Sequence, residues 1–243
     1  LGKDMFGEKA LEHYRSCGLD VSRILYSDKP SGIALITVDS LAENSIVVAS
    51  GANADITPED IDASADIIRS AGMLLLQLEI PMPAVVRAAE IAHECGVKVV
   101  LNPAPATKLP EELLRCVSIL IPNETEASAI SGIDITDLKT AGKAANLLKS
   151  KGVREIIITM GSRGTVVCDG ETSFIPARKV NAVDTTAAGD TFCGGVCVAL
   201  SEGKDIYDAV RFATVASSIA VQRPGAQDSV PSRQEVDYIM NNN

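Results

Sequence analysis

Residues 184–200 read DTTAAGDTFCGGVCVAL, and the rest of the chain is organised around this stretch. A β-prone run over 179–183 precedes it, and small and apolar residues at helical spacing follow it. We therefore predict a strand, a tight turn and the start of a helix. The unpaired N–H groups at such a helix start, together with the helix dipole, favour a bound anion.

Two carboxylates, Asp184 and Asp190, flank this turn, and the role of Asp190 allows two interpretations. A carboxylate beside an anion site repels the ligand, which makes sense for a group that accepts a proton from a nucleophile attacking a phosphoryl group. Alternatively, Asp190 is an acid that caps the helix. The motif by itself does not separate the two interpretations.

The composition excludes several classes of protein. The chain has 243 residues, 46% of them hydrophobic, with no linker or repeat, which predicts a single α/β domain over 1–243. A net charge of −10 without a Lys or Arg run argues against a nucleic-acid partner. The apolar stretches are shorter than the roughly 18 to 20 residues that span a bilayer, so we expect no membrane segment. Six scattered cysteines without metal-ligand spacing indicate reduced thiols in a cytoplasmic protein.

Short apolar runs alternate with amphipathic segments along the chain. We predict strands at 33–38, 45–49, 73–78, 97–101, 118–121, 154–159, 165–168 and 171–175. We predict helices at 6–17, 57–70, 83–95, 137–151, 188–200 and 205–222, and another after Pro231. This alternation is typical of a mostly parallel sheet covered on both faces, with ligands at the carboxyl ends of the strands.

Six motifs fall at such strand ends or in the loops near them, and together they resemble the ribokinase-like family of carbohydrate kinases. They are QLE at 77–79, NPAP at 102–105, PNETEA at 122–127, TMGSRG at 159–164, VDTTAAGDTF at 183–192 and GAQDSVP at 225–231. The resemblance implies a three-layer α/β/α sandwich with a mostly parallel central sheet. It also implies a partial β-lid over 32–50, through which family members dimerise, so we expect a homodimer.

The resemblance implies ATP-dependent phosphorylation of D-ribose at the 5-hydroxyl, giving D-ribose 5-phosphate. In this interpretation Asp190 is the general base, and the N–H groups of Ala187, Ala188 and Gly189 stabilise the transition-state charge. The family usually has Gly at the position of Ala187; because a backbone N–H makes the contact, we expect Ala to serve with a negative φ. Glu79 and Asp190 match sugar-contacting positions, although Glu79 is also explained as a loop carboxylate.

The nucleotide and Mg²⁺ positions also follow from the resemblance. Matches to nucleotide-contacting positions are Asn123, Thr159, Gly161, Gly164, Ala188, Gly189 and Thr214. Glu126 matches an acid that acts on Mg²⁺ through water. The alternative for Asn123 and Glu126 is a capping pair at a helix start, and for the glycines at 161 and 164 it is a plain turn. Arg163 either screens phosphate charge or is a solvated turn residue.

The resemblance further implies a monovalent-cation site, normally for K⁺, beside the anion turn. Its members are Asp184, Thr186, Ala220, Arg223, Gly225 and Ser229. A cation held by carbonyl groups and one carboxylate would fix the backbone dipoles of the turn. The simpler alternative is that Asp184 is only a turn acid.

The choice of substrate stays open at this point. Family members begin with a strand and a glycine-rich loop that grips the sugar, whereas Leu1 to Phe6 match a later point, so we expect a fragment or a shortened kinase. The alternatives are a fructokinase, a nucleoside kinase, or a non-catalytic remnant that only binds nucleotide. His13 and His93 lack partners at ligand spacing, and we expect them at the surface or at helix ends.

Overall fold

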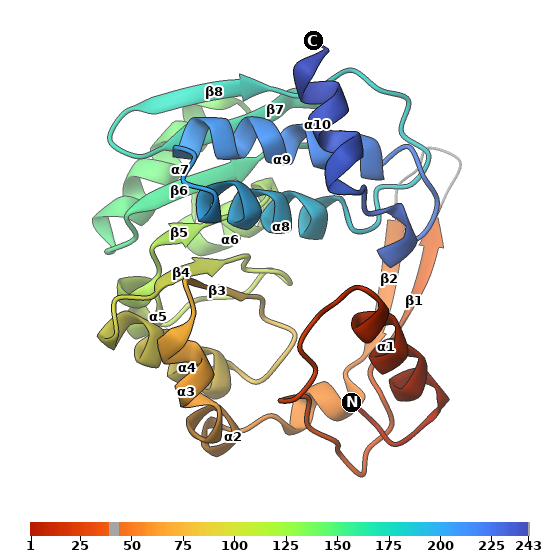
Figure 1. Cartoon of the computed structure of the whole chain (residues 1–243). Helices are drawn as coiled ribbons and strands as arrows, with labels where there is room; N and C mark the ends of the chain where they lie inside the picture. The colour runs from red at the N-terminus through yellow and green to blue at the C-terminus, as the bar shows by residue number, and fades with distance from the viewer. Residues whose placement is uncertain (39–43, 243) are drawn as a thin grey trace.

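The computed structural model describes residues 1–38 and 44–242, which contain a six-stranded sheet and a separate two-stranded ribbon. The main sheet has the order β3-β4-β5-β6-β7-β8, as Figure 1 shows. Its strands are β3 (Met73–Leu76), β4 (Lys98–Leu101), β5 (Ile119–Leu120), β6 (Glu155–Thr159), β7 (Gly164–Cys168) and β8 (Thr172–Pro176). Strands β3 to β6 pair in parallel, and β7 and β8 add antiparallel. The predicted mostly parallel sheet is confirmed.

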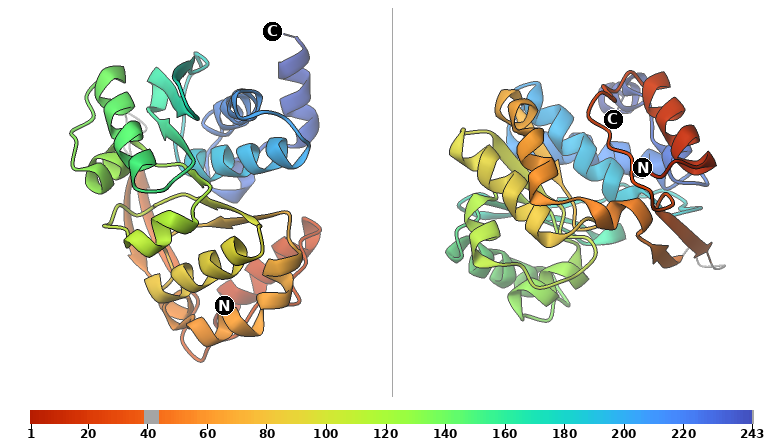
Figure 2. Two further views of the ribbon diagram at one scale, coloured as in Figure 1. Left: turned by 90° about the vertical axis from the view of Figure 1, so that its left-hand side faces the viewer. Right: turned by 90° about the horizontal axis from the view of Figure 1, so that it is seen from below.

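Helices cover both faces of this sheet (Figures 1 and 2). They are α2 (Pro58–Ala63), α3 (Ala65–Ser70), α4 (Met82–Glu94), α5 (Glu111–Cys116), α6 (Glu124–Ser131), α7 (Leu138–Ser150), α8 (Ala188–Ser201), α9 (Ile206–Ala220) and α10 (Arg233–Asn241), whereas α1 (Met5–Ser16) lies away from the sheet. Helices α4 to α7 pack on one face, and α8 to α10 on the other. This arrangement is the expected three-layer α/β/α sandwich.

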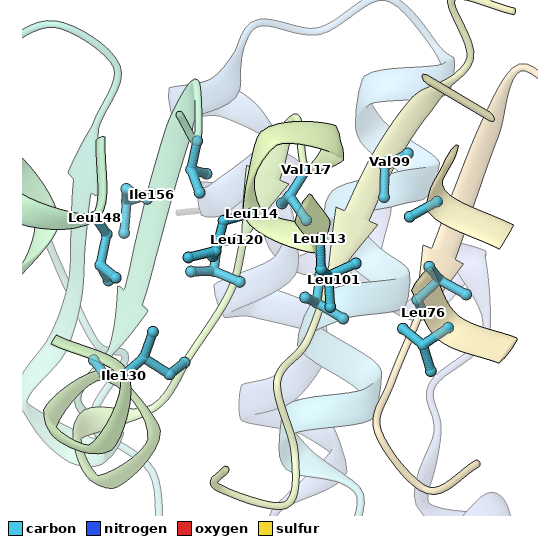
Figure 3. Packing of buried hydrophobic residues seen from close by; sticks show 14 of the residues in the cluster. Leu76, Val99, Leu101, Leu113, Leu114, Val117, Leu120, Ile130, Leu148 and Ile156 are labelled. Atoms are coloured by element: carbon cyan, nitrogen blue, oxygen red, sulfur yellow. The ribbon is translucent and has the colours of Figure 1, made fainter. Parts of the chain in front are cut away.

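Alternating side chains of the strands produce the two layers of the core. On β6, Ile156 and Ile158 contact the cluster under α4 to α7, whereas Ile157 faces α8 and α9. Successive side chains of a strand point to opposite faces, so a strand buried on both sides must be apolar throughout. Figure 3 shows the first cluster, in which Leu101 and Leu120 lie beside Leu113 and Leu114 of α5, and Ile156 lies beside Leu148 of α7. This double burial fixes the register of the strands and so the positions of the loops at their ends.

The ribbon of β1 (Ile33–Val38) and β2 (Asn44–Ala49) lies beside α1, apart from the main sheet (Figure 1). The predicted antiparallel hairpin is confirmed; of its expected polar turn at 39–44, residues 39–43 lie outside the described residues and Asn44 already belongs to β2. Apolar side chains on the ribbon are exposed; Leu35 and Val47 each expose 68% of their surface. The ribbon thus presents an apolar surface that no other described element covers.

Three predicted elements differ in the structure. The strand expected at 179–183 is wrong: the N–H of Val183 bonds instead to the carbonyl of Val221 at the end of α9. The helix expected at 57–70 is divided at Ser64, whose φ and ψ of −109° and 9° leave the helical region. Helix α5 follows Pro110 and was not expected, because its six residues are too few for a clear helical period.

No helix within the described ranges is long and apolar enough to cross a membrane.

Candidate active site

The loops after β3 to β6 meet at the carboxyl edge of the sheet and enclose one side of a cavity of about 220 Å³. Backbone hydrogen bonds join neighbouring loops, from Leu78 to Ala104 and from Thr159 to Pro122. Helix α8 closes the other side. The lining residues are Gln77, Glu79, Asn102, Ala104, Ile121, Asn123, Glu126, Thr159, Gly189, Asp190 and Cys193. The structure therefore brings together six residues that were predicted from four separate motifs, namely Glu79, Asn123, Glu126, Thr159, Gly189 and Asp190.

Asp190 lies in the first turn of α8 with its carboxylate in this cavity. Its Oδ1 accepts a hydrogen bond of 2.8 Å from Nε2 of Gln77. The N-cap residue of α8 is Ala187, and within the described part of the chain no side-chain hydrogen bond caps this helix. The interpretation of Asp190 as a capping acid is therefore wrong, and its carboxylate is available to a ligand in the cavity.

The turn before α8 has a backbone conformation that we did not expect. Ala187 has a φ of +58°, in the left-handed region, so the predicted negative φ is wrong. This conformation is unfavourable for a residue with a Cβ atom and explains why Gly is usual there. The N–H of Ala188 donates to the carbonyl of Thr185 at 3.2 Å. Among the described residues, the N–H groups of Ala187 and Gly189 have no such acceptor, so these two are available to an anion.

Asn123 and Glu126 form a capping box at the start of α6 and line the cavity as well. Oε2 of Glu126 accepts from the Asn123 N–H at 2.8 Å, and Oε1 accepts from Nδ2 of Asn123 at 2.9 Å. Burial raises the pKa of the Glu126 carboxyl, and the backbone hydrogen bond from Asn123 opposes the rise. Each oxygen of Glu126 therefore accepts one hydrogen bond from Asn123 and keeps a lone pair for a ligand in the cavity.

The turn after β6 is tight, and its backbone geometry by itself explains why Gly161 and Gly164 are glycines. Gly161 has a φ of +54°, and a Cβ atom at Gly164 would lie 2.3 Å from the carbonyl oxygen of Ile175 on β8. Neither glycine lines the cavity, whereas Thr159 does. Arg163 is paired with Glu124 and donates to the carbonyl of Thr136 at 2.8 Å, so it is neither a free cation nor a purely solvated residue.

Thr214 lies on α9, outside the residues that line the cavity. Its hydroxyl donates to the carbonyl of Val210 at 2.8 Å within the helix. The structure therefore does not bring Thr214 together with Asp190.

Asp184 is buried beside the anion turn and joins it to the loop after α9. Its Oδ1 accepts from the Thr186 N–H at 2.8 Å, and its Oδ2 accepts from the Gly225 N–H at 2.9 Å. Contacts with the hydroxyl and the N–H of Thr186, and then with the N–H of Gly225, lower the pKa of Asp184. The Thr186 hydroxyl is itself buried and makes no well-aligned hydrogen bond. A buried hydroxyl oxygen without a hydrogen-bond partner, next to an ionised carboxylate, offers the lone pairs and the negative charge that a bound cation would need.

The other members of the predicted cation site lie along the same loop. The Ala220 carbonyl accepts from the Arg223 N–H at 3.0 Å, and the fully buried Ser229 hydroxyl donates to Ala226 at 2.7 Å. The structure joins Asp184, Thr186 and Gly225 by hydrogen bonds but shows no such contact from Asp184 to Ser229. Within the described residues, no cluster of three or more His, Cys, Asp or Glu side chains could hold a metal.

With this geometry in place, comparison with known proteins identifies the family. The sequence matches the pfkB family of carbohydrate kinases over residues 1–233. The chain belongs to the PfkB carbohydrate kinase family. It is 42% identical to a ribokinase of Staphylococcus aureus, covering 98% of this chain and 80% of that protein. It is 43% identical to a ribokinase of Haemophilus influenzae, over 97% and 78% of the two chains.

A solved structure supports the same membership. The ribokinase of Arabidopsis thaliana, determined with ribose and ATP, superimposes with a TM-score of 0.92 at 33% identity. The match covers all of this chain and 80% of the Arabidopsis chain. The chain is therefore a PfkB carbohydrate kinase in sequence and in fold.

Three residues of this kinase site were not assigned a role from the sequence. Gln77 and Asn102 stood in quoted motifs, and their positions directly after buried strands were the signal that could have found them. Asn102 donates to the Ile121 carbonyl at 2.8 Å and so ties two site loops together. Cys193 lies on the floor of the cavity, where burial, and then the charge of Asp190, raise the pKa of its thiol.

The two histidines take no part in the kinase site. His93 is exposed near the end of α4, and His13 is half-buried on α1, 3.6 Å from the sulfur of Cys17. The prediction of a position at the surface or at a helix end is confirmed, since both histidines lie in the last turn of their helices.

Proposed function

We propose that this PfkB-family protein transfers the γ-phosphoryl group of ATP to the 5-hydroxyl of D-ribose, giving D-ribose 5-phosphate and ADP. The observation that carries the proposal is the carboxylate of Asp190 beside a turn in which the N–H groups of Ala187 and Gly189 have no backbone acceptor among the described residues. The relatives named above at 42% and 43% identity are ribokinases, which supports ribose as the sugar.

In the proposed reaction, Asp190 accepts the proton of the 5-hydroxyl as the sugar oxygen forms its bond to the γ-phosphorus. The bond from that phosphorus to the bridging oxygen breaks, and its electron pair leaves with ADP. The N–H groups of Ala187 and Gly189 stabilise the charge on the phosphoryl oxygens. Glu79, exposed at the cavity, contacts the sugar hydroxyls. Phosphoryl transfer depends mainly on such positioning and charge stabilisation.

ATP lies along the cavity and the turns around it in this proposal. Asn123, Thr159 and the backbone of Ala188 and Gly189 contact the phosphates, while Gly161, Gly164 and Thr214 contact the rest of the nucleotide. Mg²⁺ would neutralise phosphate charge, and Glu126 would hold its water shell. K⁺ would bind at the Thr186 hydroxyl and Asp184, with carbonyls of Ala220, Arg223 and Gly225 and the Ser229 hydroxyl, and so fix the turn that precedes α8.

The proposal also includes a homodimer in which a second copy of the chain covers the β1–β2 ribbon. Exposed apolar side chains such as Leu35 and Val47 support it, since a contiguous apolar surface is a usual site of association. Sedimentation would give a dimer for the wild type and a monomer for Leu35→Ser combined with Val47→Ser. A monomeric wild type would contradict the proposed homodimer.

A coupled assay for ADP release tests the kinase activity. We expect turnover with ATP and ribose, and less with fructose or adenosine, with dependence on Mg²⁺ and stimulation by K⁺. The Asp190→Asn variant should lose turnover and still bind ATP in calorimetry, because the amide keeps the shape but accepts no proton at neutral pH. Turnover retained by Asp190→Asn would refute its role as base. ATP binding without turnover on any sugar would favour a nucleotide-binding protein without catalysis.

A further inference from the structure

The side chain of Gln77 contacts the carboxylate of Asp190 across the cavity. Its Nε2 donates to Oδ1 of Asp190 at 2.8 Å, although the two residues are 113 positions apart. Among the described residues this is the hydrogen bond that the Asp190 side chain makes, and Oδ2 accepts none. One carboxylate oxygen is therefore held by the protein and the other is left to a ligand.

The backbone around Gln77 is held by the neighbouring loop. The Asn102 N–H donates to the Leu76 carbonyl at 2.9 Å, and the Leu78 N–H donates to the Ala104 carbonyl at 2.9 Å. Gln77 thus lies between two residues that are tied to the loop after β4. Its amide is placed by the central sheet, and it can serve as a fixed donor.

A neutral donor is the chemistry that this position requires. Rotation about the last bond of an Asp side chain turns the plane of its carboxylate, and one fixed N–H donor restricts that rotation. A positively charged side chain in place of Gln77 would form an ion pair with the Asp190 carboxylate. A second carboxylate there would repel it. The glutamine amide holds Asp190 across the ordinary pH range without changing its own charge.

We propose that Gln77 is a positioning residue, which holds Oδ1 of Asp190 and thereby presents Oδ2 to the attacking hydroxyl. The kinetic consequence rests on the function proposed above, and the contact itself does not. When a reacting group rotates slightly out of the geometry that the reaction needs, the rate falls although the substrate still binds as tightly.

The contact can be tested without turnover, by NMR of the side-chain amide of Gln77 in the whole protein. Its signals are assigned by their loss in Gln77→Met, a substitution of similar length that removes the donor. In Asp190→Asn we expect one of the two amide protons to move upfield, because it no longer faces a charged acceptor. Unchanged amide signals in Asp190→Asn would overturn the inference whether or not the protein phosphorylates ribose.

Kinetics test the consequence, with Gln234→Met on the exposed side of α10 as the matched control. We expect Gln77→Met to lower kcat by about ten- to a hundredfold with little change in the KM values for ATP and ribose. The control should match the wild type. A raised KM for ribose with an unchanged kcat would overturn the inference, since Gln77 would then be a sugar contact.

The Gln77→Glu variant adds a readout that packing does not affect. At neutral pH the introduced carboxylate should repel Asp190, whereas at lower pH a protonated carboxyl can donate in place of the amide. We therefore expect the ratio of kcat for Gln77→Glu to that for Gln77→Met to rise as the pH falls. A ratio that does not change with pH would count against the hydrogen bond as the cause. Absence of turnover in the wild type would instead contradict the proposed function, and the NMR measurement would then decide on the contact.

Discussion

The carboxylate of Asp184 accepts a 2.9 Å hydrogen bond from the N–H of Gly225, 41 residues further along the chain. Its other oxygen accepts from the Thr186 N–H, so this one buried side chain holds the anion turn against the loop after α9. Hydrogen bonds to an ionised acceptor are stronger than those between neutral groups. The shape of the turn therefore depends on the charge of Asp184.

We expect Asp184→Asn to lower the free energy of unfolding by about 1–3 kcal/mol, because the amide has one acceptor oxygen for two N–H donors. Urea unfolding measures the difference. Asp134→Asn is the matched control, since Asp134 is exposed and should change stability by less than about 0.5 kcal/mol. An Asp184→Asn variant as stable as this control would contradict the role of the side chain in holding the turn.

The same carboxylate should make the stability depend on pH. The folded state lowers the pKa of Asp184, so its contribution is fully present above the ordinary pKa of an aspartate. It is lost as the pH falls through the lowered value. The gap in unfolding free energy between the wild type and Asp184→Asn should therefore shrink as the pH falls below about 4. A gap that stays constant or widens on acidification would show that the charge is not the cause.

Ala187→Gly should stabilise the protein by about 0.5–1 kcal/mol. A left-handed backbone costs an alanine about 1–2 kcal/mol, and part of this gain is offset by the greater freedom of glycine in the unfolded chain. Ala188→Gly is the matched control: Ala188 is the first residue of α8, so the change should destabilise by about 0.5–1 kcal/mol. If Ala187→Gly and Ala188→Gly lowered the free energy of unfolding by the same amount, the backbone of Ala187 would not be strained.

Two substitutions at Glu126 separate its capping role from a role in catalysis. Glu126→Ala removes the acceptor for the Asn123 N–H and should cost about 0.5–2 kcal/mol of stability. Glu126→Gln keeps one acceptor oxygen and should remain folded, but it should need more Mg²⁺ for half-maximal activity. Activity assays over a range of Mg²⁺ concentrations, beside urea unfolding, measure both effects. Equal Mg²⁺ requirements in the wild type and Glu126→Gln would leave Glu126 with the capping role alone.

Glu126 should change the pH dependence of stability in the opposite direction to Asp184. Burial raises its pKa, so the folded state holds this proton more tightly than the unfolded chain. Its contribution to stability is therefore lost as the pH rises through the raised value. Relative to the wild type, Glu126→Gln should gain stability over that pH interval, and a constant difference would contradict the raised pKa.

Local patterns predicted the order of elements and the anion turn, because doubly buried strands require apolar runs and α8 requires small residues at its start. They did not predict the backbone of Ala187, since the Val183 and Asp184 N–H groups that lead into the turn bond to the distant Val221. The same interaction prevents the strand expected at 179–183. Gln77 belongs to one of the motifs quoted from the sequence, but only the three-dimensional structure shows that its side chain contacts Asp190.

The reactivity of the cysteines gives a direct test of how the site is packed. Cys17 and Cys95 are exposed, whereas Cys168 and Cys193 are buried, Cys193 under the cavity. Burial raises the pKa of Cys197 to about 11, so at pH 8 only about one molecule in a thousand carries that thiolate.

With Ellman's reagent in the native protein at pH 8, we expect fast labelling of Cys17 and Cys95. Cys168, Cys193 and Cys197 should react only in urea, whereas Cys116, which is half-buried and whose pKa is raised by burial, should react more slowly than Cys17 and Cys95; mass spectrometry assigns each site. Cys17→Ser combined with Cys95→Ser should abolish the fast phase. Fast modification of Cys193 in this variant would mean that the floor of the cavity opens in solution, because a buried thiol with a raised pKa reacts only when it is exposed.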